Sequence, residues 1–336
     1  FKQKTAYESG TGDWSSDVAL PICPMARPPR YIDPALKAFG LPPYIGEDAL
    51  LQGGWIDSSQ GAIQSYLDRS INRVAPDHFR AKSVLSCLLM TSLFVKKMRS
   101  GHPTGRVWGF VPEADISIWA LAYAGPIDHS RAWELYWVPI YMFVDDPAAL
   151  AGGREIFGFP KMYGTIARED NDPSDYGLSV KVAAFREFGQ DVEAEQVEVL
   201  KIDPQIHGSA EATLDDVMTG LLDEPEDADI RTLMPSLRPP QIDFPILQVK
   251  QFPSIENADF ATYQAIVGVK MTTQRLRGIG KAAGRPRLTI QSPLSLNIAQ
   301  ELDTPAVQDM QHCFWVRQDF TTQPGEILSP PELIGV

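Results

Sequence analysis

Apolar residues occur in short runs along most of the chain, and most of these runs have the composition of β-strands. Three of them, at residues 84–95, 116–123 and 133–144, are dominated by β-branched, aromatic and other apolar residues. Further strand-like runs lie at residues 46–56, 176–185, 194–202, 244–252, 261–271, 286–292 and 312–320. A chain with this many strands protects their edges best by closing into a barrel or by stacking sheets. We therefore expect a β-rich α+β protein.

Two stretches have helical spacing instead. Residues 58–74 place apolar side chains on one face of a helix, and Pro76 follows as a stop signal. These apolar side chains are Ile63, Tyr66, Leu67, Ile71 and Val74. Residues 213–222 form a second helix candidate, and the acidic residues 223–229 that follow predict a solvated surface loop. Helices are thus expected as a minor part of the fold.

Residues 145–155, DDPAALAGGRE, have the features of a single helical turn. An aspartate cap precedes Pro147, which suits the first helical position. Gly152 and Gly153 predict the end of the helix. The turn would deliver the chain to Arg154 and onward to Lys161.

The first forty-odd residues differ from the rest of the chain. They contain prolines 21, 24, 28, 29, 34, 42 and 43, so any regular structure there should be short. We expect residues 1–45 to form a proline-rich arm that lies over the domain or over a neighbouring subunit. Residues 46–336 would then form the main domain.

Composition and charge narrow the range of partners. The chain is 44% hydrophobic and 22% charged, as globular proteins are, and its net charge of -13 repels nucleic acids and anionic membrane surfaces. The longest apolar run is far shorter than the roughly 20 residues that span a bilayer, and the first residues do not resemble a signal peptide. Three widely spaced cysteines fit a reducing compartment, so we expect a cytoplasmic protein. The five histidines are scattered without metal-site spacing, and no metal is expected.

Lys161 has unusual neighbours for a charged residue. In the segment GREIFGFPKMY it follows Pro160 and lies among Phe159, Met162 and Tyr163. Attack on a carbonyl needs a neutral amine, whereas a free lysine with a pKa of about 10.4 is protonated at pH 7. Burial lowers the pKa by penalising the ammonium, so Lys161 is a candidate Schiff-base nucleophile. The alternative is that its methylenes lie on the aromatic rings while the ammonium reaches water.

The segment GREIFGFPK resembles the active-site signature of the acetoacetate decarboxylase family, whose lysine after the proline forms an imine with the substrate ketone. The resemblance continues upstream through YMFVDDPAALAGGRE, and GFVPEADISIWALA is similar to the family's strand that starts at the active-site glutamate. It places Lys161 on the nucleophile and Glu113 on the glutamate. Glu134 is a rival, and we favour Glu113 because a strand of the right character follows it directly. The resemblance covers residues 46–330 and is strongest at 141–164.

The resemblance implies an acetoacetate decarboxylase-like closed or nearly closed β-barrel with peripheral helices, and assembly into homo-oligomers. It also implies a cofactor-independent Schiff-base lyase that acts on a small keto acid or aldehyde. An imine at Lys161 would serve as an electron sink, and Glu113 would position the substrate or shuttle a proton. Arg154 would fix the loop through hydrogen bonds or contact a substrate carboxylate. The expected apolar lining residues are Met142, Phe157, Phe159 and Met162.

Two departures from the family pattern bear on the reaction. Met162 stands where the founding decarboxylases carry a second lysine, so burial would have to lower the pKa of Lys161 without a neighbouring ammonium. Ala49, and Cys87 or Leu88, stand where those enzymes place an arginine and a second glutamate. Decarboxylation of a β-keto acid is our first hypothesis. An aldolase-dehydratase that uses the same enamine is the second, and a non-catalytic ligand-binding or assembly module is the third.

Residues 275–287, RLRGIGKAAGRPR, combine glycines with cations. They lack the spacing of a phosphate-binding loop and lie between two strand-like runs. We interpret them as a basic hairpin loop, with a groove for an acidic substrate tail or a subunit contact as the alternative.

Overall fold

Long β-strands dominate the described part of this computed structural model, which comprises residues 40–168, 172–173, 175–203, 209–211, 243–282 and 284–329. These residues belong to the unit Ala38–Val336. The helix candidate at 213–222, the acidic loop at 223–229 and most of the proline-rich arm lie outside the described residues. The first strand begins at Tyr44, and the predicted boundary between residues 45 and 46 stays a prediction.

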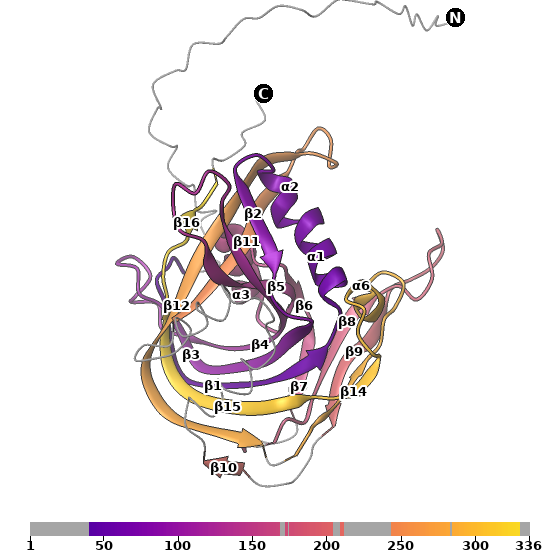
Figure 1. The fold of residues 1–336 in the computed structure, drawn as a ribbon. Helices are drawn as coiled ribbons and strands as arrows, with labels where there is room; N and C mark the ends of the chain where they lie inside the picture. The colour runs from indigo at the N-terminus through magenta and orange to yellow at the C-terminus, as the bar shows by residue number, and fades with distance from the viewer. Residues whose placement is uncertain are drawn as a thin grey trace, which may run out of the picture. The chain divides into compact units, whose positions relative to one another are not determined.

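The larger sheet closes into a ring of hydrogen-bonded strands (Figure 1). The order around the ring is β4–β3–β1–β15–β12–β11–β5, and β5 pairs again with β4. These strands are β1 (Tyr44–Asp57), β3 (Cys87–Ser100), β4 (Val111–Pro126), β5 (Glu134–Val144), β11 (Asp243–Pro253), β12 (Ala261–Ala282) and β15 (Gln311–Thr322). The ring closes through a parallel pairing of β11 with β5 at Ile246 and Trp137. The predicted β-rich, barrel-like α+β fold is confirmed.

Shorter elements surround the ring. Strands β2 (Phe79–Ser83) and β6 (Lys161–Tyr163) extend it beside β4 and β5, and β10 (Ser209–Glu211) and β16 (Glu326–Ile327) pair with β12. A separate five-stranded sheet has the order β14–β13–β9–β8–β7. Its strands are β7 (Thr165–Arg168), β8 (Leu178–Ala184), β9 (Glu195–Asp203), β13 (Arg287–Ile290) and β14 (Val307–Asp309). The peripheral helices include α1 (Gln60–Arg69), α2 (Ile71–Val74) and α6 (Ile298–Glu301), so the predicted helix at 58–74 is interrupted at Ser70.

Strand β4 separates two apolar clusters. Trp119 and Leu121 belong to the cluster inside the ring, whereas Ile116 and Ile118 belong to the cluster that also contains the buried residues of α1 and of the smaller sheet. Successive side chains of a strand point to opposite faces, which explains this division. Both faces of β4 are therefore buried, as the continuous apolar run in the sequence indicates.

A bulge in β5 turns Met142 toward the inside of the ring. Opposite β4, Tyr141 pairs with Ile118 and Pro139 pairs with Trp119, which leaves Ile140 as an extra residue. Trp137 packs inside the ring before the bulge. After the bulge the alternation is shifted by one, and Met142 joins the same cluster.

The α-helix after β5 ends at Gly152, as predicted, but the helical backbone continues beyond it as a π-helical turn. Helix α3 (Pro147–Gly152) is capped by Asp146 and continues as a short π-helix, η1 (Gly153–Phe157). Both glycines have right-handed helical backbone, and the helix ends at Gly158, whose φ is 84°. Glycine ends a helix where the backbone turns left-handed, and here only Gly158 does so. Gly153 allows the Lys161 side chain to pack closely against the backbone, because a Cβ there would lie 2.5 Å from Cδ of Lys161.

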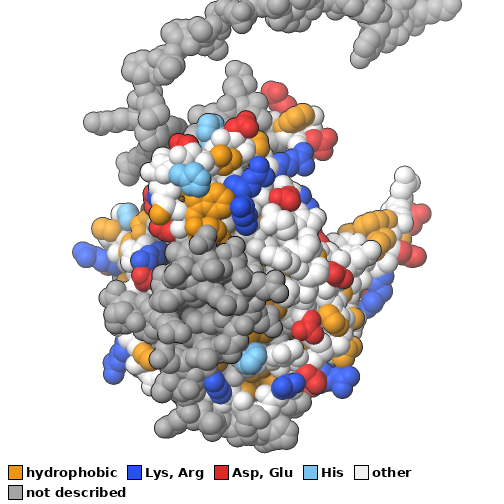
Figure 2. All heavy atoms as spheres, viewed as in Figure 1, with side chains coloured by type: hydrophobic (Ala, Val, Ile, Leu, Met, Phe, Trp, Pro, Cys, Tyr) orange, Lys and Arg blue, Asp and Glu red, His pale blue; other side chains and the backbone are white. Residues whose placement is uncertain are grey.

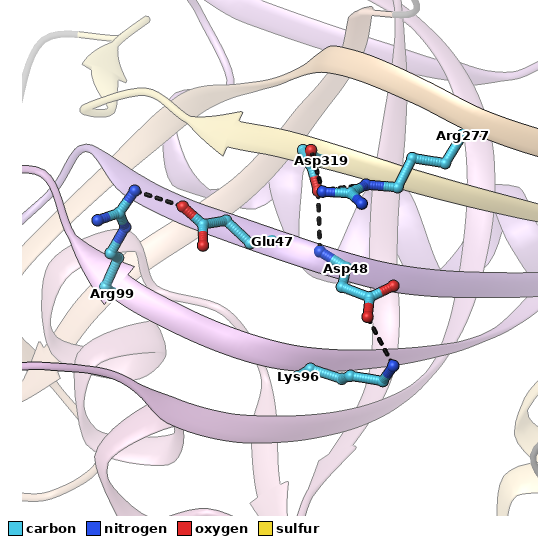
Figure 3. Close-up of polar contacts among 6 residues, drawn as sticks. All are labelled: Glu47, Asp48, Lys96, Arg99, Arg277 and Asp319. Carbon is cyan, nitrogen blue, oxygen red and sulfur yellow. Dashed lines mark hydrogen bonds and ion pairs between the residues drawn. The ribbon is translucent and has the colours of Figure 1, made fainter.

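The predicted basic hairpin loop is wrong for most of its length, because residues 275–282 belong to the 22-residue strand β12. The cations in this stretch include Arg277, which forms two hydrogen bonds to Asp319 on β15 (Figure 3). Asp319 also accepts from the backbone N–H of Asp48, and Asp48 pairs with Lys96 on β3 (Figure 3). Charged side chains in this region therefore pair between neighbouring strands, and residues 275–282 do not form the solvated loop that we predicted.

Charged side chains of both signs are interspersed on the face drawn in Figure 2. No helix within the described residues has both the length and the apolarity needed to cross a bilayer.

We predict that Gly158→Ala destabilises the protein by at least about 2 kcal/mol. The left-handed backbone costs a non-glycine residue about 1–2 kcal/mol, and the new Cβ would also lie 2.5 Å from the Cα of Lys250. Urea unfolding measures the loss. The matched control is Gly61→Ala on α1, where a Cβ meets nothing within 4 Å, and this change should be neutral or stabilise by up to about 1 kcal/mol. Equal stability of the two variants would contradict the prediction.

Candidate active site

The inside of the ring contains a mostly apolar cavity of about 190 Å³. Its walls come from β1, β3, β4, β5, β11, β12 and β15 together with the loop that leads to Lys161. The apolar and aromatic lining residues include Tyr44, Leu51, Leu89, Trp119, Met142, Phe157, Phe159, Phe244, Ile246, Phe314 and Phe320. A cavity of about 150 Å³ is large enough for benzene, so this one has room for a small organic molecule of about that size.

Lys161 projects into this cavity from β6. The strand runs parallel to β5, and Lys161 pairs in register with Met142, which is also on the inner face. Lys161 is only 6% exposed, and its Nζ donates a hydrogen bond of 2.8 Å to Oε1 of Glu113. The ammonium therefore does not reach bulk water, which rules out the alternative that Lys161 extends to solvent.

Two carboxylates on one face of β4 meet the lysine. Glu113 and Asp115 are two residues apart, and Asp115 Oδ2 lies 3.4 Å from Lys161 Nζ. Ser117, the next residue on that face, donates a hydrogen bond to Oδ1 of Asp115. The sequence interpretation missed Asp115, although the alternation of a strand placed it beside Glu113 in the segment EADIS.

The charges at the site change one sequence prediction. Burial lowers the pKa of Lys161, as expected, but the carboxylates of Glu113 and Asp115 outweigh burial and raise the pKa to about 12. Burial also raises the pKa of Asp115, and the nearby Glu113 carboxylate acts in the same direction.

The loop before Lys161 is held by hydrogen bonds from both sides. Gln248 on β11 donates to the carbonyl of Phe157 at 2.8 Å, and Arg154 donates to the carbonyl of Lys161 at 3.0 Å. Arg154 is exposed and lies in a separate groove behind the loop, outside the Lys161 cavity. Its observed contact is thus with the backbone of the loop.

The structure brings three of the four expected apolar lining residues to the lysine. Met142, Phe157 and Phe159 line the cavity, and the ring centroid of Phe159 lies 5.9 Å from Lys161 Nζ. Met162 points away and packs against the apolar cluster outside the ring, because neighbouring residues of a strand face opposite sides.

Glu134, the rival of Glu113, lies far from the lysine along β5. It is exposed and accepts a hydrogen bond from Tyr136. In the antiparallel pairing of β4 with β5, Glu134 is opposite Ala124, whereas Asp115 is opposite Val144 at the other end. The structure therefore brings Glu113, and not Glu134, to Lys161.

A second cation lies at the rim of the cavity. Arg99, near the end of β3, lines the cavity, is partly exposed and forms an ion pair with Glu47 of β1 (Figure 3). Among the described lining residues, Arg99 and Lys161 carry the positive charges. Within the described ranges, no group of three or more His, Cys, Asp or Glu residues has the arrangement of a metal site.

The fold and this geometry agree with comparisons to known proteins. The model of the acetoacetate decarboxylase (ADC) family matches residues 126–330, which is more than half of the chain and includes Lys161. A search of curated proteins finds no match.

Several solved structures have a similar fold at low sequence identity. An acetoacetate decarboxylase from Legionella pneumophila is 14% identical with a TM-score of 0.56, and the match covers 97% of this chain and 98% of that chain. A second acetoacetate decarboxylase structure is 12% identical with a TM-score of 0.54, covering 86% and 91% of the two chains. The enduracididine biosynthesis enzyme MppR, with HEPES bound, is 13% identical with a TM-score of 0.51, covering 87% and 90%. From the family match and the shared fold we conclude that this chain belongs to the acetoacetate decarboxylase family.

Proposed function

We propose that the protein is a cofactor-independent Schiff-base lyase that decarboxylates a small β-keto acid. The observation that carries the proposal is a lysine buried in a cavity of about 190 Å³, with its Nζ hydrogen-bonded to Glu113. Family membership supports Schiff-base lyase chemistry in general. The cavity volume suits a small substrate.

The amine becomes nucleophilic by passing its proton to Glu113. The high pKa of Lys161 keeps the resting amine charged, and the Glu113 oxygen at 2.8 Å is in position to accept a proton directly. In an apolar cavity a neutral amine beside a neutral carboxylic acid competes well with an ion pair, because neither member then carries a buried charge. Entry of a substrate that displaces residual water favours this transfer further.

The neutral Nζ then attacks the keto carbon, and loss of water leaves a protonated imine. When the bond to the carboxylate carbon breaks, its electron pair forms a carbon–carbon double bond, and the imine π electrons move to nitrogen. Carbon dioxide leaves, the enamine takes up one proton at carbon, and water releases the ketone and regenerates Lys161. Every step uses side chains of this chain and water.

A second candidate is an aldolase-dehydratase. The observation that favours it is the second carboxylate, because aldol chemistry removes a proton from carbon and also returns one, whereas decarboxylation only adds a proton. Carbon dioxide release from β-keto acids, compared with products that form only when an aldehyde is added, distinguishes the two reactions.

We predict that borohydride reduction in the presence of acetoacetate or pyruvate adds one substrate-derived group to the protein, on Lys161. Intact mass and peptide mapping measure the adduct. Lys161→Arg keeps a cation beside the two carboxylates but cannot form the imine, so it should show no adduct and no turnover.

Lys250 provides the matched control. Burial lowers the pKa of Lys250, and its Nζ lies over the rings of Phe252 and Tyr263 outside the cavity. Of these two lysines, Lys250 is the one whose pKa is lowered, so a choice by pKa alone would favour Lys250. Lys250→Gln should leave the adduct unchanged, and an adduct that maps to Lys250 would overturn the proposal.

The close packing of Gly153 against Lys161 gives another prediction. Alanine at position 153 would not strain the backbone, because φ there is -63°. The new Cβ would, however, lie 2.5 Å from Cδ of Lys161. The flexible lysine can move aside, so stability should fall by only about 1–3 kcal/mol. The displaced amine should react with acetoacetate about 100-fold more slowly in the borohydride assay. An unchanged adduct rate would contradict this role of Gly153.

The position of Arg99 at the cavity rim predicts a preference for substrates that carry a carboxylate. Arg99→Gln should raise the KM for acetoacetate roughly tenfold, the effect of one charge-assisted hydrogen bond. Imine formation with acetone, which has no charge, should not change. The control is Lys96→Gln, because Lys96 is an exposed cation of the same strand that pairs with Asp48 and does not line the cavity. Equal effects on acetoacetate and acetone would contradict the prediction.

A further inference from the structure

Asp115 is a second buried carboxylate beside the candidate nucleophile. It is 6% exposed, and its Oδ2 lies 3.4 Å from Lys161 Nζ. Its other oxygen, Oδ1, accepts a hydrogen bond from Ser117, which fixes the orientation of the carboxyl group. Burying a carboxyl group in an apolar cavity is costly, and the polar partners of this one are the Lys161 ammonium and the Ser117 hydroxyl.

Glu113 and Asp115 are placed for different tasks. Glu113 Oε1 is bound to the lysine nitrogen at 2.8 Å, and a protonated imine retains one N–H that can keep this hydrogen bond. The Asp115 oxygen is farther from the nitrogen. The carbon next to the imine carbon is two bonds from Nζ, so an oxygen at the distance of Asp115 Oδ2 is within reach of its hydrogen.

We propose that Asp115 is a further catalytic residue, which removes and returns the proton at the carbon next to the imine carbon. This inference rests on the proposed function, because it requires an imine at Lys161. In this division of roles, Glu113 exchanges a proton with Nζ of Lys161, and Asp115 exchanges a proton with the substrate carbon.

The proton transfer balances in both directions. The Asp115 carboxylate takes a proton from the carbon, the C–H electron pair becomes the carbon–carbon double bond of the enamine, and the imine π pair moves to nitrogen. In reverse, the Asp115 carboxyl gives up its proton, the enamine π pair forms the new C–H bond, and nitrogen becomes a protonated imine again. Neither direction needs another reactant.

The surroundings of Asp115 suit a group that both holds and releases a proton. The titratable groups that face it are Lys161 on β6 and Glu113 on its own strand, and its partners across the strand pairings are the apolar residues Leu93 and Val144. Burial raises the pKa of Asp115, whereas Lys161 and the Ser117 hydrogen bond lower it. The net effect raises the pKa of Asp115 above that of an ordinary aspartate, in the direction that general acid–base catalysis near neutral pH favours.

A consequence concerns the class of substrate. If Asp115 can remove a proton from carbon, the enamine forms from a carbonyl compound that has a hydrogen next to its carbonyl, and loss of carbon dioxide is not required. The site would then accept simple 2-keto acids and ketones as enamine donors. This extends the proposed function toward aldol chemistry.

Exchange of the methyl protons of pyruvate in D₂O, followed by proton NMR, tests the inference. Pyruvate has no carboxylate at the position that decarboxylation requires, so its exchange reports proton transfer at carbon alone. Borohydride trapping of pyruvate is measured on the same samples, so that exchange is expressed per imine formed. The full chain is used throughout.

Asp115→Asn should change proton exchange and borohydride trapping differently. Trapping should persist and move to lower pH, because one of the carboxylates that keep Lys161 charged is removed. Exchange per imine should fall by about 100-fold or more, the usual contribution of a general acid–base group. A residue with a merely structural role would reduce both measurements together.

Ser117→Ala gives an independent readout in a protein that keeps Asp115. Proton removal requires Asp115 as the carboxylate, so exchange should rise as the pH rises through its pKa. The Ser117 hydrogen bond lowers that pKa, and its removal should move the rising limb of the exchange profile to higher pH. If Asp115→Asn does not fold, the exchange profile of Ser117→Ala still tests whether Asp115 transfers the proton at carbon.

The possible failures can be told apart. Trapped Lys161 with exchange in Asp115→Asn within about threefold of the unmodified protein would overturn the role of Asp115 and leave the proposed function intact. An exchange profile that Ser117→Ala does not move would also overturn it. Absence of any Lys161 adduct in the unmodified protein would overturn both the proposed function and this inference.

Discussion

One buried ammonium shared between two carboxylates is the interaction on which the site depends. Lys161 lies inside an apolar ring of strands, where an isolated charge would be very costly. Glu113 and Asp115 offset that cost, and in doing so they raise the pKa of the lysine to about 12 rather than lowering it. In the proposed reaction the amine is charged at rest, so a proton has to move to a carboxylate before Lys161 can attack a carbonyl.

The barrel and the loop before Lys161 together hold these three groups in contact. Strand β4 supplies both carboxylates on one face, and β6 presents the lysine parallel to β5. The π-helical turn η1 allows Gly153 to pack against the lysine methylenes, and Gly158 reverses the chain toward β6. Arg154 fixes the backbone from outside the cavity through the Lys161 carbonyl. The segment GREIFGFPK thus forms, in this fold, a loop that positions the side chain of Lys161.

The same geometry relates the proposed decarboxylase and aldolase-dehydratase reactions. Both pass through an enamine on Lys161, and they differ in whether a proton must be removed from carbon. Met162, which replaces the second lysine of the founding decarboxylases, packs outside the ring, so the site has no neighbouring ammonium from this position. Asp115 places a second carboxylate beside the lysine.

Much of this could be read from local sequence, because strand composition, helix caps and the signature motif act over a few residues. The strand runs, the cap at Asp146 and the roles suggested for Lys161 and Glu113 all came from such patterns, and family membership and the barrel were confirmed. Contacts between distant segments could not be read in this way. The helix end at Gly158, the inclusion of residues 275–282 in β12 and the bulge that turns Met142 inward depend on what packs against each segment. The sign of the Lys161 pKa shift depends on two carboxylates nearly fifty residues away in the chain, because burial and ion pairing act in opposite directions and only their distances determine which prevails.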